Sequence, residues 1–172
     1  MNILWITNII LPAPCKALNM PAPVFGGWMH GLAMQVASSP DIRLAVASTY
    51  QDAKLKSSDI DKVTYYLLPA KSTTTYQKSL EQYWQTVCNE FKPDVVHIHG
   101  TEYALGLACM RACPSFNYVI SIQGLIGICS RYYYASIKYI FGAAIRPDIK
   151  HGVIIPKSVY LVDIYGWIRI ST

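Results

Sequence analysis

The sequence predicts a three-layer α/β domain in which helices cover both faces of a mostly parallel sheet. Short apolar runs of strand length alternate with segments of helical period along most of the chain, as this class requires. Hydrophobic residues make up 52% of the 172 residues and charged residues 15%, against a typical charged share of about 25%. This composition excludes intrinsic disorder, and the length suits one domain of roughly 100–200 residues.

Five strands are expected where short apolar runs are bounded by turn residues. The run Ile3–Thr7 is rich in β-branched residues and ends at Asn8, and Val95–Ile98 is apolar on both faces, as a buried parallel strand must be. The polar residues 54–62 read as a loop. The expected strands span residues 2–7, 43–48, 63–67, 94–98 and 118–122.

Three helices are expected between these strands, at residues 28–37, 75–91 and 101–112. The segment 75–91 has the clearest helical period and stops at Lys92-Pro93. In the segment 28–37, Trp28, Leu32 and Val36 share one face at i, i+4 spacing. The small residues of 101–112 favour close packing against the sheet.

Two segments resist assignment to regular structure. Residues 9–25 contain four prolines and read as a long loop, a length typical of functional loops. Beyond residue 124, the tyrosines and Phe141 of 132–141 suggest an aromatic helix that either packs or meets a lipid headgroup or a partner domain. Residues 142–172 have an indistinct pattern, with a strand expected only at 159–164.

The predicted sheet points to three candidate ligand-binding segments. In open parallel sheets, ligands bind beyond the carboxyl ends of the strands. Here those ends are followed by residues 8–27, 99–102 and 123–127. The sequence therefore directs attention to Gly26-Gly27, His99-Gly100 and Gln123-Gly124.

Gly26-Gly27 stands immediately before a predicted helix, and two interpretations of the pair are possible. The pair either lets a phosphate or sugar approach the free N–H groups of the helix N-terminus or forms a turn that needs positive φ. Neither the G-x-G-x-x-G dinucleotide fingerprint nor the G-x-x-x-x-G-K-[ST] P-loop occurs.

His97 and His99 lie two residues apart on one predicted strand and therefore on the same face. They could ligate a metal, but no spacing signature supplies a third ligand. The favoured interpretation places His97 in the interior and His99 at the strand end as a binding or catalytic group. An imidazole near its reference pKa of about 6.5 can hydrogen-bond or act as a weak base.

The net charge and the cysteines of the chain indicate which binding partners and which cellular compartment to expect. The net charge is +5, without a basic run or a stripe of interleaved bases and aromatics, so nucleic acid is not an expected partner. Attraction to anionic substrates or to an acidic membrane surface stays open. Five cysteines without a C-x-x-C pair indicate buried thiols, Cys109 and Cys113 among them, in a reducing cytoplasm. Neither a signal peptide nor an apolar run long enough to span a membrane is found.

Three segments together resemble the N-terminal domain of a family 4 glycosyltransferase with the GT-B fold. The resemblance covers about residues 1–140, and the order and spacing of the segments make it more specific than any one motif. It rests on residues 1–7 with the following loop and Gly26-Gly27-Trp28, on Lys92-Pro93-Asp94-Val95-Val96-His97-Ile98-His99-Gly100, and on Tyr118-Val119-Ile120-Ser121-Ile122-Gln123-Gly124.

The resemblance implies half of a two-domain enzyme that transfers a sugar from a nucleotide-sugar to a glycan or lipid-linked acceptor. The N-terminal Rossmann-like domain mainly holds the acceptor, and the other domain mainly holds the donor. The chemistry is commonly retaining and uses no essential metal, and no cofactor is expected. The implied catalytic residue is His99, and the implied substrate-binding residues are Gly26, Gly27, Trp28, Gly100, Glu102, Gln123 and Gly124.

The sequence also departs from the family. No Glu follows Glu102, so the family's E-x7-E donor motif is absent, and 141–172 does not match the usual continuation. We therefore expect a chain without its donor-binding domain, inactive alone, placed in the cytoplasm or at the inner face of a membrane. An uncovered apolar face would favour a homo-oligomer. The alternatives are a non-catalytic Rossmann-like binding module or subunit, and an unrelated α/β enzyme such as a hydrolase, for which no G-x-S-x-G or H-E-x-x-H motif is present.

Overall fold

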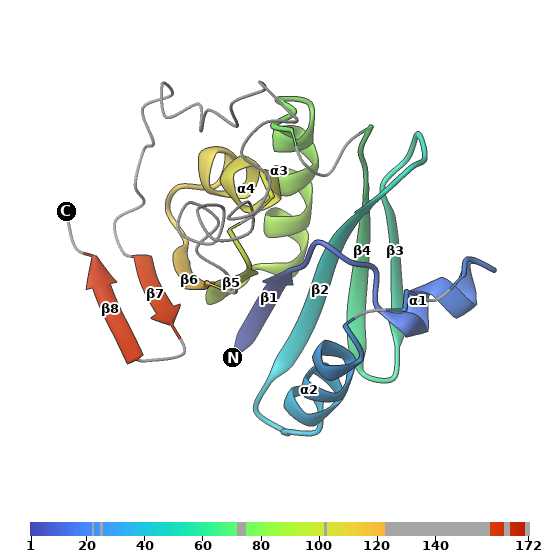
Figure 1. The fold of residues 1–172 in the computed structure, drawn as a ribbon, viewed down its shortest axis with the longest axis horizontal. Helices are drawn as coiled ribbons and strands as arrows, with labels where there is room; N and C mark the ends of the chain where they lie inside the picture. Colours follow the sequence, from blue (N-terminus) through green and yellow to red (C-terminus); the bar gives the residue numbers. More distant parts are fainter. Residues whose placement is uncertain are drawn as a thin grey trace, which may run out of the picture.

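The computed structural model describes residues 1–21, 23–24, 26–71, 75–101 and 103–122, and the backbone of two further strands between residues 159 and 170. Figure 1 shows the arrangement of the elements. The strands are β1 (Asn2–Ile6), β2 (Arg43–Tyr50), β3 (Lys56–Ile60), β4 (Val63–Pro69), β5 (Val95–His99), β6 (Asn117–Ser121), β7 (Val159–Asp163) and β8 (Gly166–Ile170). The helices are α1 (Pro12–Ala17), α2 (Gly27–Ala37), α3 (Leu80–Phe91) and α4 (Leu105–Ala112).

The strands form one mostly parallel sheet in the order β3-β4-β2-β1-β5-β6-β7-β8. The central strands β4, β2, β1, β5 and β6 pair in parallel, whereas β3 pairs antiparallel with β4. β7 adds a parallel strand beside β6, and β8 pairs antiparallel with β7. The α/β class and the mostly parallel sheet are thus as the sequence predicts, and they are consistent with a Rossmann-like fold.

Two separate hydrophobic clusters pack against opposite sides of the sheet strands. The first joins β-strand residues such as Ile98 to Trp84 of α3 and Leu105 of α4. The second joins residues such as Trp5 to Met29 of α2 and to Leu11, just before α1. Alternate residues of a strand point to opposite faces, and adjacent β1 residues accordingly enter different clusters. Figure 1 shows α3 and α4 above the strands and α2 below them.

Two segments expected to be loops form regular structure. Residues 12–17 make the short helix α1 because Pro12 lies in its first turn, where the missing N–H costs no hydrogen bond. The polar residues 56–60 form an edge strand, since exposed polar side chains suit a sheet edge. Asp61 and Lys62, with φ of 51° and 66°, make the two-residue turn into β4.

The ends of the other elements shift by a few residues. α3 begins at Leu80 and α4 at Leu105, later than the apolar patterns indicate. β2 continues to Tyr50, and β7 falls on the strand expected at 159–164. The aromatic helix expected at 132–141 lies outside the described residues.

The buried face of α2 differs from the face that the spacing indicates. Met29, Ala33 and Ala37 are buried, whereas Trp28 and Leu32 are 58% and 42% exposed. Both sets recur at i, i+4 spacing, so periodicity alone does not distinguish them. Met29 and the two alanines therefore face the sheet, whereas Trp28 and Leu32 face outward and Val36 is half-buried against the same cluster.

Three cysteines occupy the core, one in α3, one in α4 and one just after α4, as expected for small apolar residues. Cys88, Cys109 and Cys113 are buried free thiols in the α3–α4 cluster. The Tyr118 hydroxyl donates to the backbone oxygens of Cys109 at 3.2 Å and Cys113 at 2.8 Å. Burial raises the pKa of the Cys109 thiol well above its usual value, which keeps this thiol protonated.

Candidate functional site

The strand order places a possible ligand site where β1 and β5 lie side by side. From β1 the chain proceeds to β2 and β4 on one side of the sheet, and then returns to β5 and β6 on the other side. Ile6 of β1 pairs with Ile98 of β5, so the carboxyl ends of both strands meet. In open α/β sheets, ligands bind at such a change of direction, beyond the carboxyl ends of the strands.

Gly26 and Gly27 differ in what the fold requires of them. Gly26 precedes α2 with φ of 85°, and a Cβ there would meet Ile9 Cδ1 at 1.9 Å. Its backbone oxygen accepts from the Met29 N–H at 3.0 Å. Gly27 has no positive φ, and a Cβ added to it would meet nothing within 4 Å. The turn explains Gly26, whereas the described fold gives no reason for glycine at position 27.

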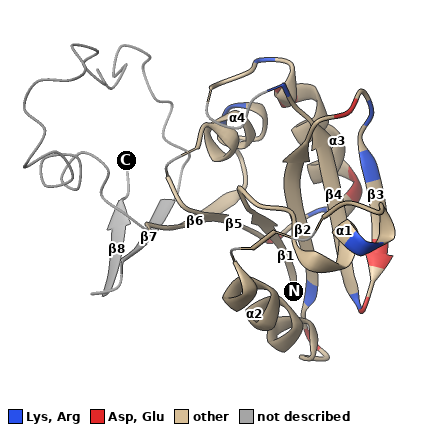
Figure 2. Cartoon of the chain, turned by 45° about the vertical axis from the view of Figure 1, so that its right-hand side comes forward, with Lys and Arg blue, Asp and Glu red and all other residues tan. Residues whose placement is uncertain are grey.

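The first turn of α2 offers polar backbone groups without a protein cap. No side chain caps the helix N-terminus, and no acidic residue lies in its first turn. α2 contains no Lys, Arg, Asp or Glu, and Figure 2 accordingly shows α2 in tan, with charged residues on β3, on other helices and on connecting loops. An added group near Gly27 would therefore meet helix N–H groups and an exposed indole, that of Trp28, rather than a charged side chain.

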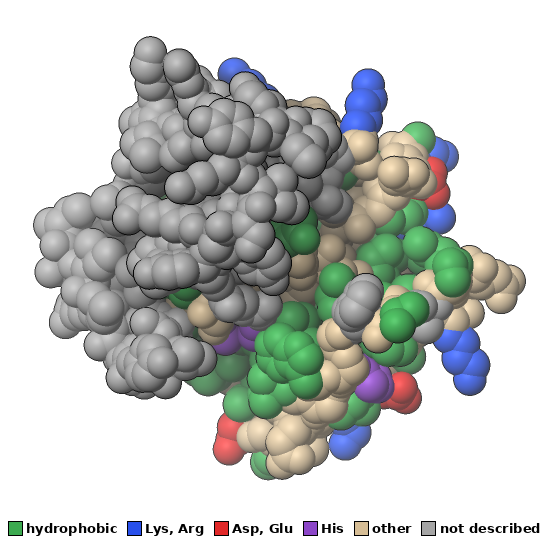
Figure 3. Space-filling view, viewed as in Figure 1, with side chains coloured by type: hydrophobic (Ala, Val, Ile, Leu, Met, Phe, Trp, Pro, Cys, Tyr) green, Lys and Arg blue, Asp and Glu red, His purple; other side chains and the backbone are tan. Residues whose placement is uncertain are grey.

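His99 ends β5 among the rings of His97, Trp5 and Trp28. Its side chain is 5% exposed. Its ring centroid lies 4.0 Å from that of His97, 4.6 Å from that of Trp5 and 6.4 Å from that of Trp28. The first turn of α2 therefore lies beside the end of β5, as the sequence interpretation expects. Figure 3 shows histidine surface adjoining hydrophobic surface near α2.

The two histidines differ in their hydrogen bonds. His97 Nε2 shares a hydrogen bond of 2.7 Å with Ser121 Oγ of β6. His97 is half-buried and His99 is buried, so the prediction of an interior His97 and an emerging His99 is wrong in burial. His99 Nε2 is buried and meets no hydrogen-bond partner in the described part of the chain. A buried polar nitrogen without a partner costs about 1–3 kcal/mol, so His99 carries an unused hydrogen-bonding group beside the change of strand direction.

Burial also changes the chemistry expected of His99. It lowers the pKa of His99 to about 3, and the neighbouring His97 adds to the effect. Burial likewise lowers the pKa of His97 to about 4. The sequence interpretation expected His99 near its reference value of about 6.5, where it could also act as a base. At pH 7 the buried imidazole is neutral and suited to hydrogen bonding, because effective general bases have a pKa near the working pH.

No family model matches this chain. No curated protein matches it either. Its possible function therefore rests on the geometry of the described residues and on the resemblance noted in its sequence.

The remaining expected site residues fall into two groups. Gly100 has φ of 93° and donates its N–H to the Ser121 backbone oxygen at 2.8 Å, so the backbone itself requires glycine there. Glu102, Gln123 and Gly124 lie outside the described residues. Among the residues that the structure describes, no group of three or more His, Cys, Asp or Glu is arranged to hold a metal ion. None of the described helices is long and apolar enough to cross a membrane.

The sequence analysis did not predict a pair of buried hydroxyls, those of Thr7 and Ser48, near the carboxyl ends of β1 and β2. Thr7 Oγ1 and Ser48 Oγ lie 2.8 Å apart, and each hydroxyl also lies 2.8 Å from the Ile9 backbone oxygen. They fix the loop whose Ile9 side chain lies against Gly26. The sequence signal that could have revealed the pair is that each hydroxyl residue stands near the carboxyl end of a predicted strand. Hydroxyls buried there need hydrogen-bond partners. The pair holds the α2 entry in place.

Proposed function

We propose that the chain is the acceptor-side half of a glycosyltransferase that moves a sugar from a nucleotide-sugar to a glycan or lipid-linked acceptor. In this proposal residues 1–140 form the three-layer Rossmann-like domain of a GT-B enzyme, and a separate domain binds the donor. The support is the sequence resemblance, the mostly parallel sheet and the position of His99 and α2 at the change of strand direction.

The observation that carries the proposal is the buried His99 Nε2, which has no hydrogen-bond partner among the described residues. It is one of five such buried atoms there, and it lies at the carboxyl end of β5 with its ring beside Trp28 of α2. Most buried polar side-chain atoms in proteins are hydrogen-bonded, so an exception needs a physical reason. A sugar hydroxyl supplies it, because it can both donate and accept a hydrogen bond. A ligand at this edge would restore the missing interaction and thereby gain affinity.

Each nearby residue has a distinct part in holding such a ligand. Gly27 leaves space for the ligand to approach the N–H groups at the start of α2. Trp28, which is 58% exposed, offers an apolar ring to the carbon face of a sugar. His99 in its neutral form orients a hydroxyl by a hydrogen bond and does not remove its proton.

The neutral His99 also favours a second function, a glycan-binding module without catalysis. A group with a pKa of about 3 is a poor general base at pH 7. If sugar transfer occurs, the charge that develops in the transition state would have to be stabilised by groups of the donor-binding domain. The two functions differ in one result, since only the transferase half would support sugar transfer when a donor-binding domain is supplied.

The test compares two glycine substitutions on the same helix. Gly27→Ala should weaken binding of a neutral disaccharide at least about tenfold, because its methyl group occupies the approach to the α2 N-terminus. Gly31→Ala is the matched control, since Gly31 is exposed on α2 and a Cβ there also meets nothing within 4 Å. The probes are maltose, lactose, mannobiose and chitobiose, each titrated by calorimetry or NMR.

Binding of at least one disaccharide that is lost in Gly27→Ala and kept within about twofold in Gly31→Ala would support the proposal. UDP-glucose and GDP-mannose should bind more weakly than about millimolar, because the family assigns the donor to the other domain. Equal binding by both variants, or tight stoichiometric binding of a nucleotide-sugar to this chain, would contradict it.

A further inference from the structure

A cavity of about 750 Å³ opens at the same edge of the sheet, away from His99. It lies where β2 and β4 end and where α3 begins, and its volume is within the usual range of about 300–1,000 Å³ for small-molecule sites. Its lining residues are Gln51, Asp52, Ala53, Pro69, Ala70, Lys71, Gln77, Ser79 and Tyr83. Three strand spacings, β4 to β2 to β1 to β5, separate it from β5, a distance of about 14 Å.

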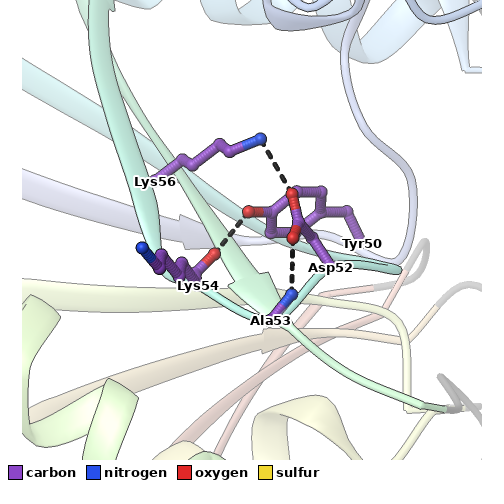
Figure 4. A network of polar contacts seen from close by, with 5 residues as sticks. All are labelled: Tyr50, Asp52, Ala53, Lys54 and Lys56. Atoms are coloured by element: carbon purple, nitrogen blue, oxygen red, sulfur yellow. Dashed lines mark hydrogen bonds and ion pairs between the residues drawn. The ribbon is translucent and has the colours of Figure 1, made fainter.

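Hydrogen bonds hold one wall of the cavity in place (Figure 4). Asp52 accepts from the Ala53 N–H at 2.6 Å and from Lys56 Nζ at 2.9 Å. The Tyr50 hydroxyl donates to the Lys54 backbone oxygen. These contacts close the loop between β2 and β3 on itself, so the wall exists before any ligand arrives.

The opposite wall follows β4 and is fixed by another hydrogen bond. The Lys71 N–H donates to Gln77 Oε1 at 3.1 Å, which ties the end of β4 to the segment before α3. Tyr83 of α3 is half-buried beside the half-buried Pro69 and Ala70. Together these three side chains give the cavity an apolar part between two polar walls.

The cavity is lined by two charged side chains, Asp52 and Lys71, and they differ in whether they are free to bind a ligand. The Asp52 carboxylate is already paired with Lys56. The exposed Lys71 ammonium has no partner in the part of the chain that the structure describes. The ligand that matches this arrangement has an apolar ring face, several hydroxyls for Gln51 and Ser79, and one negative charge for Lys71.

We propose that this cavity binds a sugar residue bearing an acidic group, either a carboxylate or a phosphate, as a remote unit of the acceptor glycan. The glycan class of the ligand rests on the proposed function, whereas the preference for negative charge rests on the cavity alone. Because α2 and α3 lie on opposite faces of the sheet, a glycan that contacts both His99 and Lys71 would have to pass over the carboxyl edge of the sheet as well as across three strand spacings.

The experiment titrates the full chain, labelled with ¹⁵N, with glucuronate, glucose 6-phosphate and glucose. The amides of residues 51–53, 70–71 and 83 should shift on titration. At least one acidic sugar should bind about fivefold more tightly than glucose, because an exposed ion pair contributes modestly to affinity. Lys71→Gln should remove that difference. Lys54→Gln removes the same charge from an exposed lysine of the neighbouring loop that does not line the cavity, and it should keep the difference.

A preference for glucuronate alone would assign a uronic acid, and a preference for glucose 6-phosphate alone would assign a sugar phosphate. Equal affinity for all three sugars, an unchanged preference in Lys71→Gln, or shifts outside the cavity would overturn the inference. The readout is confined to the amides around the cavity. Failure here therefore leaves the proposed function standing, whereas failure of the Gly27 comparison removes the transferase role and leaves the charge preference.

Discussion

Lowering the pH from 7 to 5 is expected to reduce the free energy of unfolding by about 4 kcal/mol. Burial lowers the pKa of His97 to about 4 and that of His99 to about 3, whereas both titrate near 6.5 in the unfolded chain. Between these values the unfolded chain binds two protons that the folded chain does not. Each of these protons changes the free energy of unfolding by about 1.4 kcal/mol per pH unit. The contribution of the two neutral histidines to stability is therefore fully present well above pH 6.5, and it decreases as the pH falls.

Urea unfolding at pH 7, 6 and 5 measures this dependence. His97→Leu and His99→Leu should each remove about half of the slope, although each substitution also changes stability at pH 7. The slope is the informative quantity because it counts protons and is insensitive to packing changes common to all three pH values. A wild-type stability that is flat between pH 7 and pH 5 would show that the two imidazoles are not buried as neutral rings.

Gly106→Ala should destabilise the fold by up to about 2 kcal/mol, despite the better helix propensity of alanine. A Cβ at position 106 would lie 2.7 Å from Ile98 Cγ2 and 2.9 Å from Ile98 Cδ1. Ile98 is buried and β-branched, so its Cγ2 cannot rotate away without cost. α4 would have to move away from β5, and overpacking of this kind costs about 1–3 kcal/mol against a gain of about 1 kcal/mol.

Gly31→Ala provides the comparison for this prediction as well. Its added methyl group meets no atom within 4 Å, so the change should stabilise α2 by up to about 1 kcal/mol. Denaturant midpoints of the two variants should therefore move in opposite directions. If Gly106→Ala also stabilised the protein, the close packing of α4 on β5 would be refuted.

Local patterns predicted the elements that bury apolar side chains most completely. Val95–Ile98 is apolar on both faces and forms β5 of the sheet interior, and the helical period before Lys92 marks α3. Elements without such a pattern were missed. β3 is polar because it lies at the sheet edge, and α1 begins at prolines that also suit a loop. Residue spacing cannot separate these alternatives, since tertiary contacts decide them.

The sequence predicted where the candidate site residues lie better than it predicted the chemical properties of their side chains. Strand ends follow from the alternation of elements, which placed His99 and Gly26-Gly27 at one edge of the sheet. The pKa of His99 depends on Trp5 and His97, whose rings surround it only in the folded sheet. The separate reasons for glycine at positions 26 and 27 likewise depend on where the Ile9 side chain lies. No sequence pattern contains that information.

The imidazole nitrogen spectrum of His99 tests the central claim, that this edge of the sheet is a ligand site, most directly. At pH 7, ¹⁵N spectra of the free chain should show a neutral ring, with Nε2 at the shift of a nitrogen without a strong hydrogen bond. Addition of the disaccharide that binds most tightly should move the His99 Nε2 resonance and leave the His97 resonance, bonded to Ser121, nearly in place. A His99 resonance that stays unchanged at saturating ligand would contradict the claim.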